Sequence, residues 1–234
     1  NIVDVAHRLG VKSPLGAIPA IVLGAQAVSP LDMASAFSTI ANYGKRVDTY
    51  LIERIEDVDG NVIYQHQTIS TQVVEPALAA AVVNTMEQVI TRGTGPRANI
   101  GRPQAGKTGT HENNTDTWFV GYVPQYTTAV WVGFPDAQVE MKNITVDGVF
   151  YSRVYGSTLA APIWKEFMTL VTSDLPVENF PSDPAGTGVY YQTPREEIPD
   201  VTGLTFEEAQ EALFQAGFNV NARLENSVQP RDTV

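Results

Sequence analysis

Apolar side chains recur every three or four residues in several stretches of the chain, the spacing of one face of an α-helix. The predicted helices cover residues 1–9, 30–43, 76–92 and a segment that begins at Pro162. Before the second helix, Ser29 is a good N-cap, because its hydroxyl can accept from a backbone N–H, and a proline follows it. The side chains expected to face inward from the second and fourth helices are Met33, Phe37, Ile40, Ile163, Phe167 and Leu170.

Segments rich in β-branched and aromatic residues predict strands. They cover residues 50–64, 104–110, 117–123 and 127–134. The first is expected to be a hairpin closed by a two-residue turn at Asp59-Gly60, a dipeptide that favours such turns. The last two join at Pro124-Gln125 and are expected to pair antiparallel, with Trp118 and Trp131 facing each other. Helices combined with an antiparallel sheet place the chain in the α/β (α+β) class.

A change of composition divides the chain. Residues 176–197 are rich in Pro and Gly and lack periodicity, as linkers do, so residues 1–175 form the first predicted unit. In residues 198–234, Thr205 and Glu208 make a capping box that begins a short helix, and a strand is expected after it. About 37 residues bury little core, so we expect this last unit to be part of a βαβ domain.

The chain has 234 residues, with 15 Lys and Arg against 26 Asp and Glu, and its formal net charge is −11. This excess of acids argues against a nucleic-acid partner, because phosphate binding needs a positive surface. There is no cysteine, which excludes disulfides and thiol catalysis. His7, His66 and His111 lack the spacing of metal ligands, so no metal and no cofactor is expected. No apolar run reaches the roughly 18 residues of a membrane-spanning helix.

Residues 101–110 (GRPQAGKTGT) match motifs of two unrelated protein classes. Gly101 followed by four residues and Gly106-Lys107-Thr108 satisfies the P-loop pattern, which needs a buried strand before it and a helix after it. Neither flank has that character, and Pro103 removes a backbone N–H from the loop that should bind phosphate. The sequence therefore disfavours a nucleotide-hydrolysing enzyme.

The second match is Lys107-Thr108-Gly109 on a predicted strand, a signature of serine acyl-transfer enzymes. A peptide substrate could pair along the strand, where Gly109 lets the acyl carbon approach the backbone. Thr108 and Thr110 share a face, and their hydroxyls can bind a carboxylate. Lys107 adds positive charge near the proton path of the nucleophile. We expect Lys107 to be catalytic and Thr108, Gly109 and Thr110 to bind substrate; an ordinary strand with a surface lysine is the alternative.

With its neighbouring segments, this motif resembles the C-terminal part of the transpeptidase domain of class A (bifunctional) penicillin-binding proteins. The resemblance covers about residues 1–172 and is carried by Ser29–Ala34, Gly106–Thr110, Asp116–Tyr122, Ala129–Gly133 and Ala161–Trp164. Residues 198–234 resemble the start of a PASTA domain, through Pro199-Asp200-Val201 and Gly203-Leu204.

The resemblance implies a penicillin-binding/β-lactamase-like fold, a mostly antiparallel sheet flanked by helices, with the motif strand beside the active-site cleft. It implies D,D-transpeptidation of peptidoglycan stem peptides through a serine acyl-enzyme, with β-lactams as inhibitors. It also implies a bacterial protein at the extracytoplasmic face of the cell membrane, with a glycosyltransferase domain and a membrane anchor upstream.

The chain departs from the family pattern in two ways. No serine has Lys three positions later or Asn two positions later. The Ser-x-x-Lys nucleophile motif and the Ser-x-Asn motif are therefore expected upstream of Asn1, and the chain alone is expected to be inactive. His111 stands where the family more often has a small hydroxyl residue.

Two alternatives to the transpeptidase remain open. One is a non-catalytic sensor that binds muropeptides. The other is a hydrolase of the D,D-carboxypeptidase or β-lactamase type, since water and an amine compete for the same acyl-enzyme.

Overall fold

The computed structural model describes residues 2–181 and 199–216. They fall into two compact units, residues 1–187 and 188–234. The helices of the first unit are α1 (Ile2–Leu9), α2 (Pro30–Ala41), α3 (Pro76–Thr91) and α4 (Ala161–Val171), with the short turns η1 (Pro19–Leu23), η2 (Pro96–Ala98) and η3 (Gly156–Ala160). Its strands are β1 (Lys45–Val47), β2 (Arg54–Glu56), β3 (Val62–Gln65), β4 (Ser70–Gln72), β5 (Ala105–Thr110), β6 (Asp116–Tyr122), β7 (Thr127–Gly133), β8 (Lys142–Val146) and β9 (Val149–Arg153).

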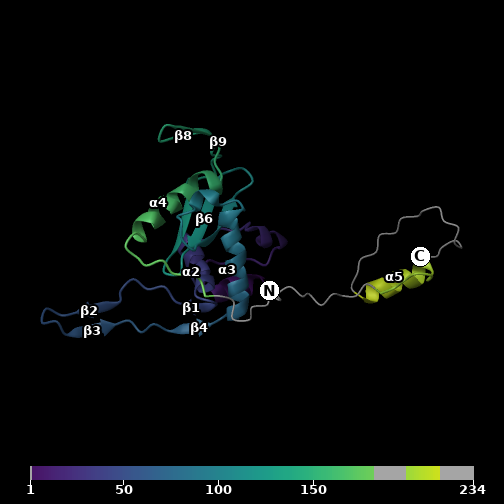
Figure 1. Ribbon diagram of the computed structural model, residues 1–234, viewed down its shortest axis with the longest axis horizontal. Coiled ribbons are helices and arrows are strands. Elements are labelled where there is room, and N and C mark those ends of the chain that lie inside the picture. The colour runs from purple at the N-terminus through teal and green to yellow at the C-terminus, as the bar shows by residue number, and fades with distance from the viewer. Residues whose placement is uncertain (1, 182–198, 217–234) are drawn as a thin grey trace. The chain divides into compact units, whose positions relative to one another are not determined.

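An antiparallel sheet of order β5–β6–β7 forms the centre of the first unit (Figure 1). Successive side chains of β6 point to opposite faces of the sheet. On one face Phe119 packs with Trp164 and Met168 of α4. On the other face Tyr122 packs with Ile40 of α2 and Val83 of α3. Helices therefore cover both faces, and the antiparallel sheet flanked by helices is confirmed.

The strands of this sheet lie where the sequence predicts them, because their β-branched and aromatic residues fit a buried, pleated surface. The hairpin between β6 and β7 closes at residues 123–126, where the Val123 N–H donates to the Tyr126 carbonyl (2.9 Å). Trp118 pairs with Trp131 across the two strands, and their ring centroids are 6.4 Å apart. The predicted pairing of the two tryptophans is therefore confirmed.

The inward face predicted for α4 is wrong. Ile163, Phe167 and Leu170 are exposed, Leu170 by 73%, whereas Trp164 and Met168 are fully buried. The Nε1–H of Trp164 is shared between two carbonyl oxygens of the sheet, those of Gly121 (3.2 Å) and Thr128 (3.1 Å). These hydrogen bonds and the volume of the indole ring, rather than the number of apolar residues, set the rotation of the helix.

The predicted cap of α2 is confirmed, but its buried face is partly polar. Ser29 and Asp32 form a capping box, since each side chain accepts from the backbone N–H of the other residue. Ile40 is buried as expected, while Met33 and Phe37 are half-buried. The fully buried positions of the helix include Asp32 and Thr39, and the Thr39 hydroxyl donates to the Leu9 carbonyl (2.7 Å). Hydrogen bonds to α1 and to the following loop explain why these polar groups face inward.

The hairpin predicted over residues 50–64 forms from β2 and β3, but not with a two-residue turn. The loop spans Asp57 to Asn61, whose backbones pair (2.9 Å), and Gly60 has the positive φ of 85°. The Asp57 carboxylate accepts from the backbone N–H groups of Asp59 and Asn61, which stabilises the wider loop. A carboxylate that binds its own turn in this way favours a longer connection than the dipeptide alone indicates.

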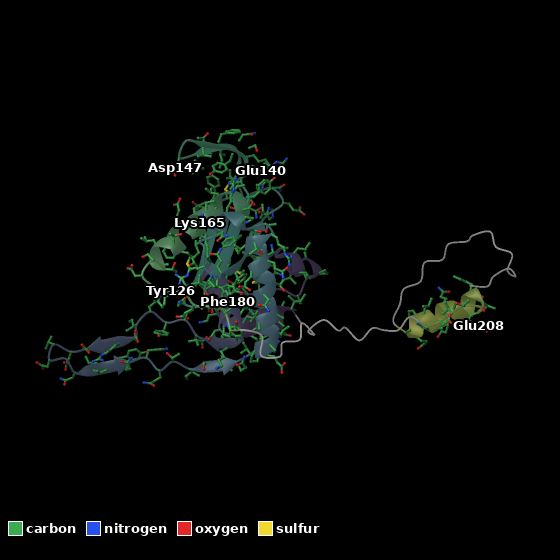
Figure 2. All side chains as sticks on the ribbon, in the orientation of Figure 1. Tyr126, Glu140, Asp147, Lys165, Phe180 and Glu208 are labelled. Atoms are coloured by element: carbon green, nitrogen blue, oxygen red, sulfur yellow. The ribbon has the colours of Figure 1, made fainter. Side chains whose placement is uncertain are left out.

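Outside the sheet, β8 and β9 form a hairpin, and the ion pair between Glu140 and Lys142 (2.8 Å) lies at its start (Figure 2). In the second unit the structure describes α5 (Phe206–Gln215). Its predicted capping box is confirmed, because Thr205 and Glu208 bond each other's backbone N–H groups. The strand predicted after α5 lies outside the described residues, as does most of the predicted linker.

Candidate active site

The four residues singled out by the sequence lie on β5, at one edge of the central sheet. β5 pairs with β6 alone among the described strands, with Lys107 opposite Val120 and Gly109 opposite Trp118. The other edge of β5 thus presents backbone N–H and C=O groups that an extended peptide could pair with. The Gly106-Lys107-Thr108 segment is a strand followed by another strand, so the P-loop alternative is excluded by its local structure.

Lys107 and Thr108 bring a charge and a hydroxyl to this strand. The exposed Lys107 ammonium donates to the carbonyl of Thr108 (2.9 Å), which keeps the charge close to the strand. The Thr108 hydroxyl lies 2.6 Å from the hydroxyl of Thr94, in the loop after α3. An ammonium and neighbouring hydroxyls are groups that bind a carboxylate.

Thr94 is a candidate site residue that sequence reasoning missed. It lies between Gly93 and Gly95, and a Cβ on Gly93 would come within 2.7 Å of the Val89 Cα. A Cβ on Gly95 would lie 3.2 Å from the Phe119 ring, so both glycines pack closely on their neighbours in the loop that places Thr94 against Thr108. The signal in the sequence is this pair of glycines on either side of a hydroxyl residue, directly after the helix predicted over residues 76–92.

Gly109 lies in a crowded part of the sheet. A Cβ added to Gly109 would lie 3.1 Å from the Trp118 Cβ. On η3, a Cβ added to Gly156 would lie 2.5 Å from the Gly109 carbonyl oxygen, so the two backbones approach closely. The Gly156 N–H also donates to the Thr110 hydroxyl (3.1 Å), which leaves the hydroxyl proton able to donate to a ligand. The lack of a side chain at Gly156 therefore lets η3 pack on the Gly109 backbone, while a Cβ at Gly109 itself would press against Trp118.

A chain of hydrogen bonds supports the strand beyond Thr110. The exposed His111 ring approaches the Thr115 hydroxyl with its Nδ1 (3.1 Å), and that hydroxyl donates to the Asp116 carboxylate (2.9 Å). The other oxygen of Asp116 accepts from the Trp131 indole N–H (2.9 Å). Asp116 therefore has a local hydrogen-bonding role at the start of β6, and it orients the loop that carries His111.

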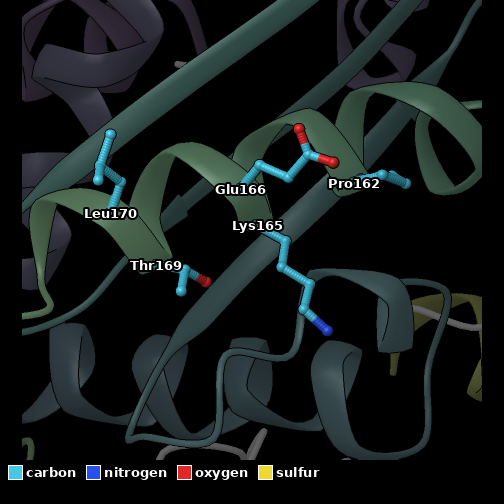
Figure 3. A pocket seen from close by; sticks show the side chains of 5 residues that line it. All are labelled: Pro162, Lys165, Glu166, Thr169 and Leu170. Carbon is cyan, nitrogen blue, oxygen red and sulfur yellow. The ribbon is translucent and has the colours of Figure 1, made fainter. Parts of the chain in front are cut away.

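A hollow elsewhere on the surface is unrelated to these residues (Figure 3). It is lined by Pro162, Lys165, Glu166, Thr169 and Leu170, all from α4. No residue of β5 borders it, and side chains of one helix do not converge as in a binding site. In the described part of the chain, no group of His, Asp and Glu residues is arranged to hold a metal ion.

Comparison with known proteins identifies the fold and the family. The family model for the penicillin binding protein transpeptidase domain matches residues 16–169, which include all of β5. The chain belongs to this family. Penicillin-binding protein 1A of Neisseria lactamica is 34% identical over 196 residues, an alignment that covers 79% of this chain and 23% of that protein. The chain thus spans about a quarter of the length of this curated relative, and it is a transpeptidase domain homologous to those of the class A penicillin-binding proteins 1A.

Solved structures of the family agree with this assignment. The penicillin-binding protein PonA1 from Mycobacterium tuberculosis superposes with a TM-score of 0.66 at 30% identity, over 77% of this chain and 51% of that one. PonA1 in complex with penicillin V superposes with a TM-score of 0.62 over the same shares. In residues 2–181 and 199–216, no helix has both the length and the apolar character to cross a membrane.

Proposed function

We propose that this penicillin-binding transpeptidase domain binds peptidoglycan stem peptides along the free edge of β5 and takes part in D,D-transpeptidation. The observation that carries the proposal is the Lys107–Thr110 motif on an edge strand whose outer backbone groups can pair with an extended peptide. The hydroxyls of Thr108 and Thr110 donate hydrogen bonds to the terminal carboxylate of the substrate. Gly109 faces the acyl carbon, and Lys107 supplies positive charge beside the nucleophile. Binding energy at the carboxylate fixes the geometry of the bond that reacts.

The serine nucleophile of this reaction comes from outside the printed sequence. No serine here has the Ser-x-x-Lys or Ser-x-Asn pattern that the family uses for nucleophile and proton transfer. The chain therefore supplies the substrate-binding share of the site, and by itself it forms no acyl-enzyme. β-Lactams inhibit the complete enzyme by acylating the same serine, a proposal supported by the penicillin V complex of PonA1.

The setting of the protein is part of the same proposal. A domain that cross-links the cell wall works on the extracytoplasmic face of a bacterial membrane, and the family relationship supports that location. Residues 198–234 are the beginning of a PASTA domain, supported by the capping box and buried Ala209 of α5.

The location of the nucleophile is tested by labelling with a fluorescent penicillin. The 234-residue chain is expected to carry no covalent label after denaturing electrophoresis. The longer protein that contains an upstream Ser-x-x-Lys is expected to be labelled. A stable adduct on the printed chain alone would place the nucleophile within it and contradict the proposal.

The role of β5 is tested in that longer, acylation-competent protein. Thr110→Val removes a hydroxyl that we assign to the substrate carboxylate, and a hydrogen bond to a charged group contributes about 1.5–3 kcal/mol. The second-order rate of penicillin acylation should therefore fall by about tenfold or more. Thr110→Ser keeps the hydroxyl and should retain the rate, and Thr145→Val on β8 is the matched control. An unchanged rate in Thr110→Val would remove this residue from the site.

Two further outcomes separate the proposed transpeptidase from its alternatives. The longer protein, incubated with a stem-peptide donor and an acceptor amine, should form a cross-linked product. Without the amine it should form none. Hydrolysis alone would identify a carboxypeptidase or β-lactamase. Reversible muropeptide binding by a full-length protein that penicillin does not label would identify a sensor.

A further inference from the structure

Residues 50–69, which we call the arm, extend away from the central sheet of the first unit (Figure 1). Their large apolar side chains are exposed. The exposed large hydrophobic residues of the arm are Tyr50, Leu51, Ile52, Ile55, Val58, Val62, Ile63, Tyr64 and Ile69. Leu51 and Val58 are as exposed as in an extended chain. A two-stranded ribbon is marginally stable in water on its own, and grouped apolar side chains on a surface mark an interaction site.

The pairing of the two strands shows where a partner can add. Glu56 pairs with Val62 and Ile55 with Tyr64, so the extra residue of the bulge, Ile63, belongs to β3. β2 therefore keeps a strict alternation of its backbone groups. Such an alternation sends the N–H and C=O of every second residue to the same edge.

Hydrogen bonds at the two ends of β2 fix which residues point outward. The Glu53 carbonyl accepts from the His66 N–H (2.7 Å), and the Asp57 N–H donates to the Asn61 carbonyl (2.9 Å). The backbone N–H and C=O groups of residues 53, 55 and 57 thus face β3. Those of residues 54 and 56 point to the outer edge. Among the described strands, none pairs with that edge. An unpaired edge of this kind is a template for one more strand.

One face of the arm supplies apolar and aromatic contacts beside this edge. Ile55 and Tyr64 lie directly opposite each other and are each 43% exposed. The Tyr50 ring stacks on the His66 ring with centroids 3.7 Å apart and planes inclined by 19°. Every second side chain of an added strand would lie next to this face.

The charge of the arm selects the chemistry of the partner. The arm carries four acids, Glu53, Glu56, Asp57 and Asp59, and a single basic residue, Arg54, so its formal charge is −3. All four acids lie on the β2 side or in the turn, and Arg54 forms an ion pair with Glu56. A second copy of this chain, with a net charge of −11, or an anionic lipid surface would be repelled. A basic segment would be attracted.

We propose that the arm docks an extended protein segment of alternating basic and apolar residues, which adds as a third strand to the outer edge of β2. Ile55 and Glu56 lie on opposite faces of β2 because successive side chains of a strand alternate. The apolar side chains of the segment therefore cover Ile55 and Tyr64, and its basic side chains meet Glu56 on the other face. This interaction is independent of the acyl-transfer site, so the failure of either proposal leaves the other intact.

The test uses a fluorescein-labelled peptide of four Lys-Val repeats, titrated with the full chain and followed by fluorescence anisotropy. Saturable binding that weakens at high salt is expected, because the attraction is partly between exposed charges. Glu56→Pro should weaken binding at least tenfold, because proline removes an N–H that points to the outer edge and leaves the bonds to β3 in place. Glu56→Gln removes the charge but keeps the N–H and should weaken binding only two- to threefold.

Circular dichroism of each variant controls for folding, and a peptide of four Glu-Val repeats controls for the sign of the charge. Equal binding by Glu56→Pro and the unaltered chain would overturn edge addition. A concentration-dependent dimer that Glu56→Pro abolishes would make a second copy the occupant and overturn the proposal. Binding to uncharged phosphatidylcholine vesicles that Glu56→Pro abolishes would do the same in favour of a membrane.

Discussion

Asp32 joins three segments of the chain through a single buried carboxylate. It accepts from the backbone N–H groups of Lys12 (2.8 Å), Ser13 (3.2 Å) and Ser29 (3.4 Å), and from the Ser13 hydroxyl. Burial by itself would raise the pKa of this carboxyl. The hydrogen bonds from Ser13, Lys12 and Ser29 outweigh burial and lower the pKa of Asp32 from 3.8 to about 2. A capping acid is therefore also the link between α2 and the loop after α1.

The pH dependence of stability follows from this lowered pKa. The unfolded state takes up the proton first as the pH falls, so the contribution of Asp32 is complete above about pH 4 and is lost toward pH 2. Asp32→Asn should lower the free energy of unfolding by about 2 kcal/mol at pH 7, and by less at pH 3. Urea denaturation at both pH values measures the difference, with exposed Asp136→Asn as control. An equal loss at both pH values would contradict the assignment.

At the scale of elements, the rotation of α4 depends on one large side chain. Trp164 contacts Phe119 edge-on, with ring centroids 5.2 Å apart, and fills the space above the glycine at position 121. Three other apolar residues of the helix stay in solvent. A periodic pattern indicates a helix correctly but selects its buried face only when the sheet beneath it has no stronger preference.

Neighbouring positions on α4 give a direct test of this rotation. Trp164→Ala should lower the free energy of unfolding by about 3–5 kcal/mol, because it removes a fully buried ring and leaves a cavity. Ile163→Ala, at a position 41% exposed, should lower it by less than about 1 kcal/mol. Chemical denaturation of the two variants compares them. A larger loss for Ile163→Ala would mean that the sequence-based prediction of the buried face was right.

At the scale of the whole first unit, the segment after α4 packs against the sheet and the loops beside it. The Arg102 guanidinium donates to the carbonyls of Thr172 (2.8 Å) and Pro176 (2.5 Å), and the Gln125 amide also donates to Pro176 (3.0 Å). Phe180, labelled in Figure 2, packs edge-on against Tyr122 with centroids 5.6 Å apart. Residues up to 181 therefore contribute to the stability of the transpeptidase unit.

Removal of the Phe180 ring should measure that contribution. Phe180→Ala is expected to lower the free energy of unfolding by about 2 kcal/mol, from lost apolar burial and the lost aromatic contact. Val177→Ala lies in the same segment at a position 67% exposed and should change it by less than about 0.5 kcal/mol. Thermal unfolding followed by circular dichroism distinguishes the two. A Phe180→Ala variant as stable as the unaltered chain would show that the segment lies loosely on the sheet.

The sequence by itself determined the type and approximate limits of most elements and the strand position of Lys107–Thr110. Caps such as Ser29, paired tryptophans and stretches of β-branched residues act through neighbours in the chain or in an adjacent strand, so their effect can be derived from local patterns.

Only the tertiary structure decided which face of α4 is buried, that β5 is an edge strand, and which groups surround its motif. Thr94 meets Thr108 across 14 positions of the chain, and Gly156 meets Thr110 across 46. Contacts at such separations depend on how the helices pack on the sheet, and residue periodicity carries no information about that packing. The wider turn of the arm was also decided by contacts that the dipeptide alone does not show. The Asp57 side chain binds backbone N–H groups of the turn and competes with the backbone preference of Asp59-Gly60.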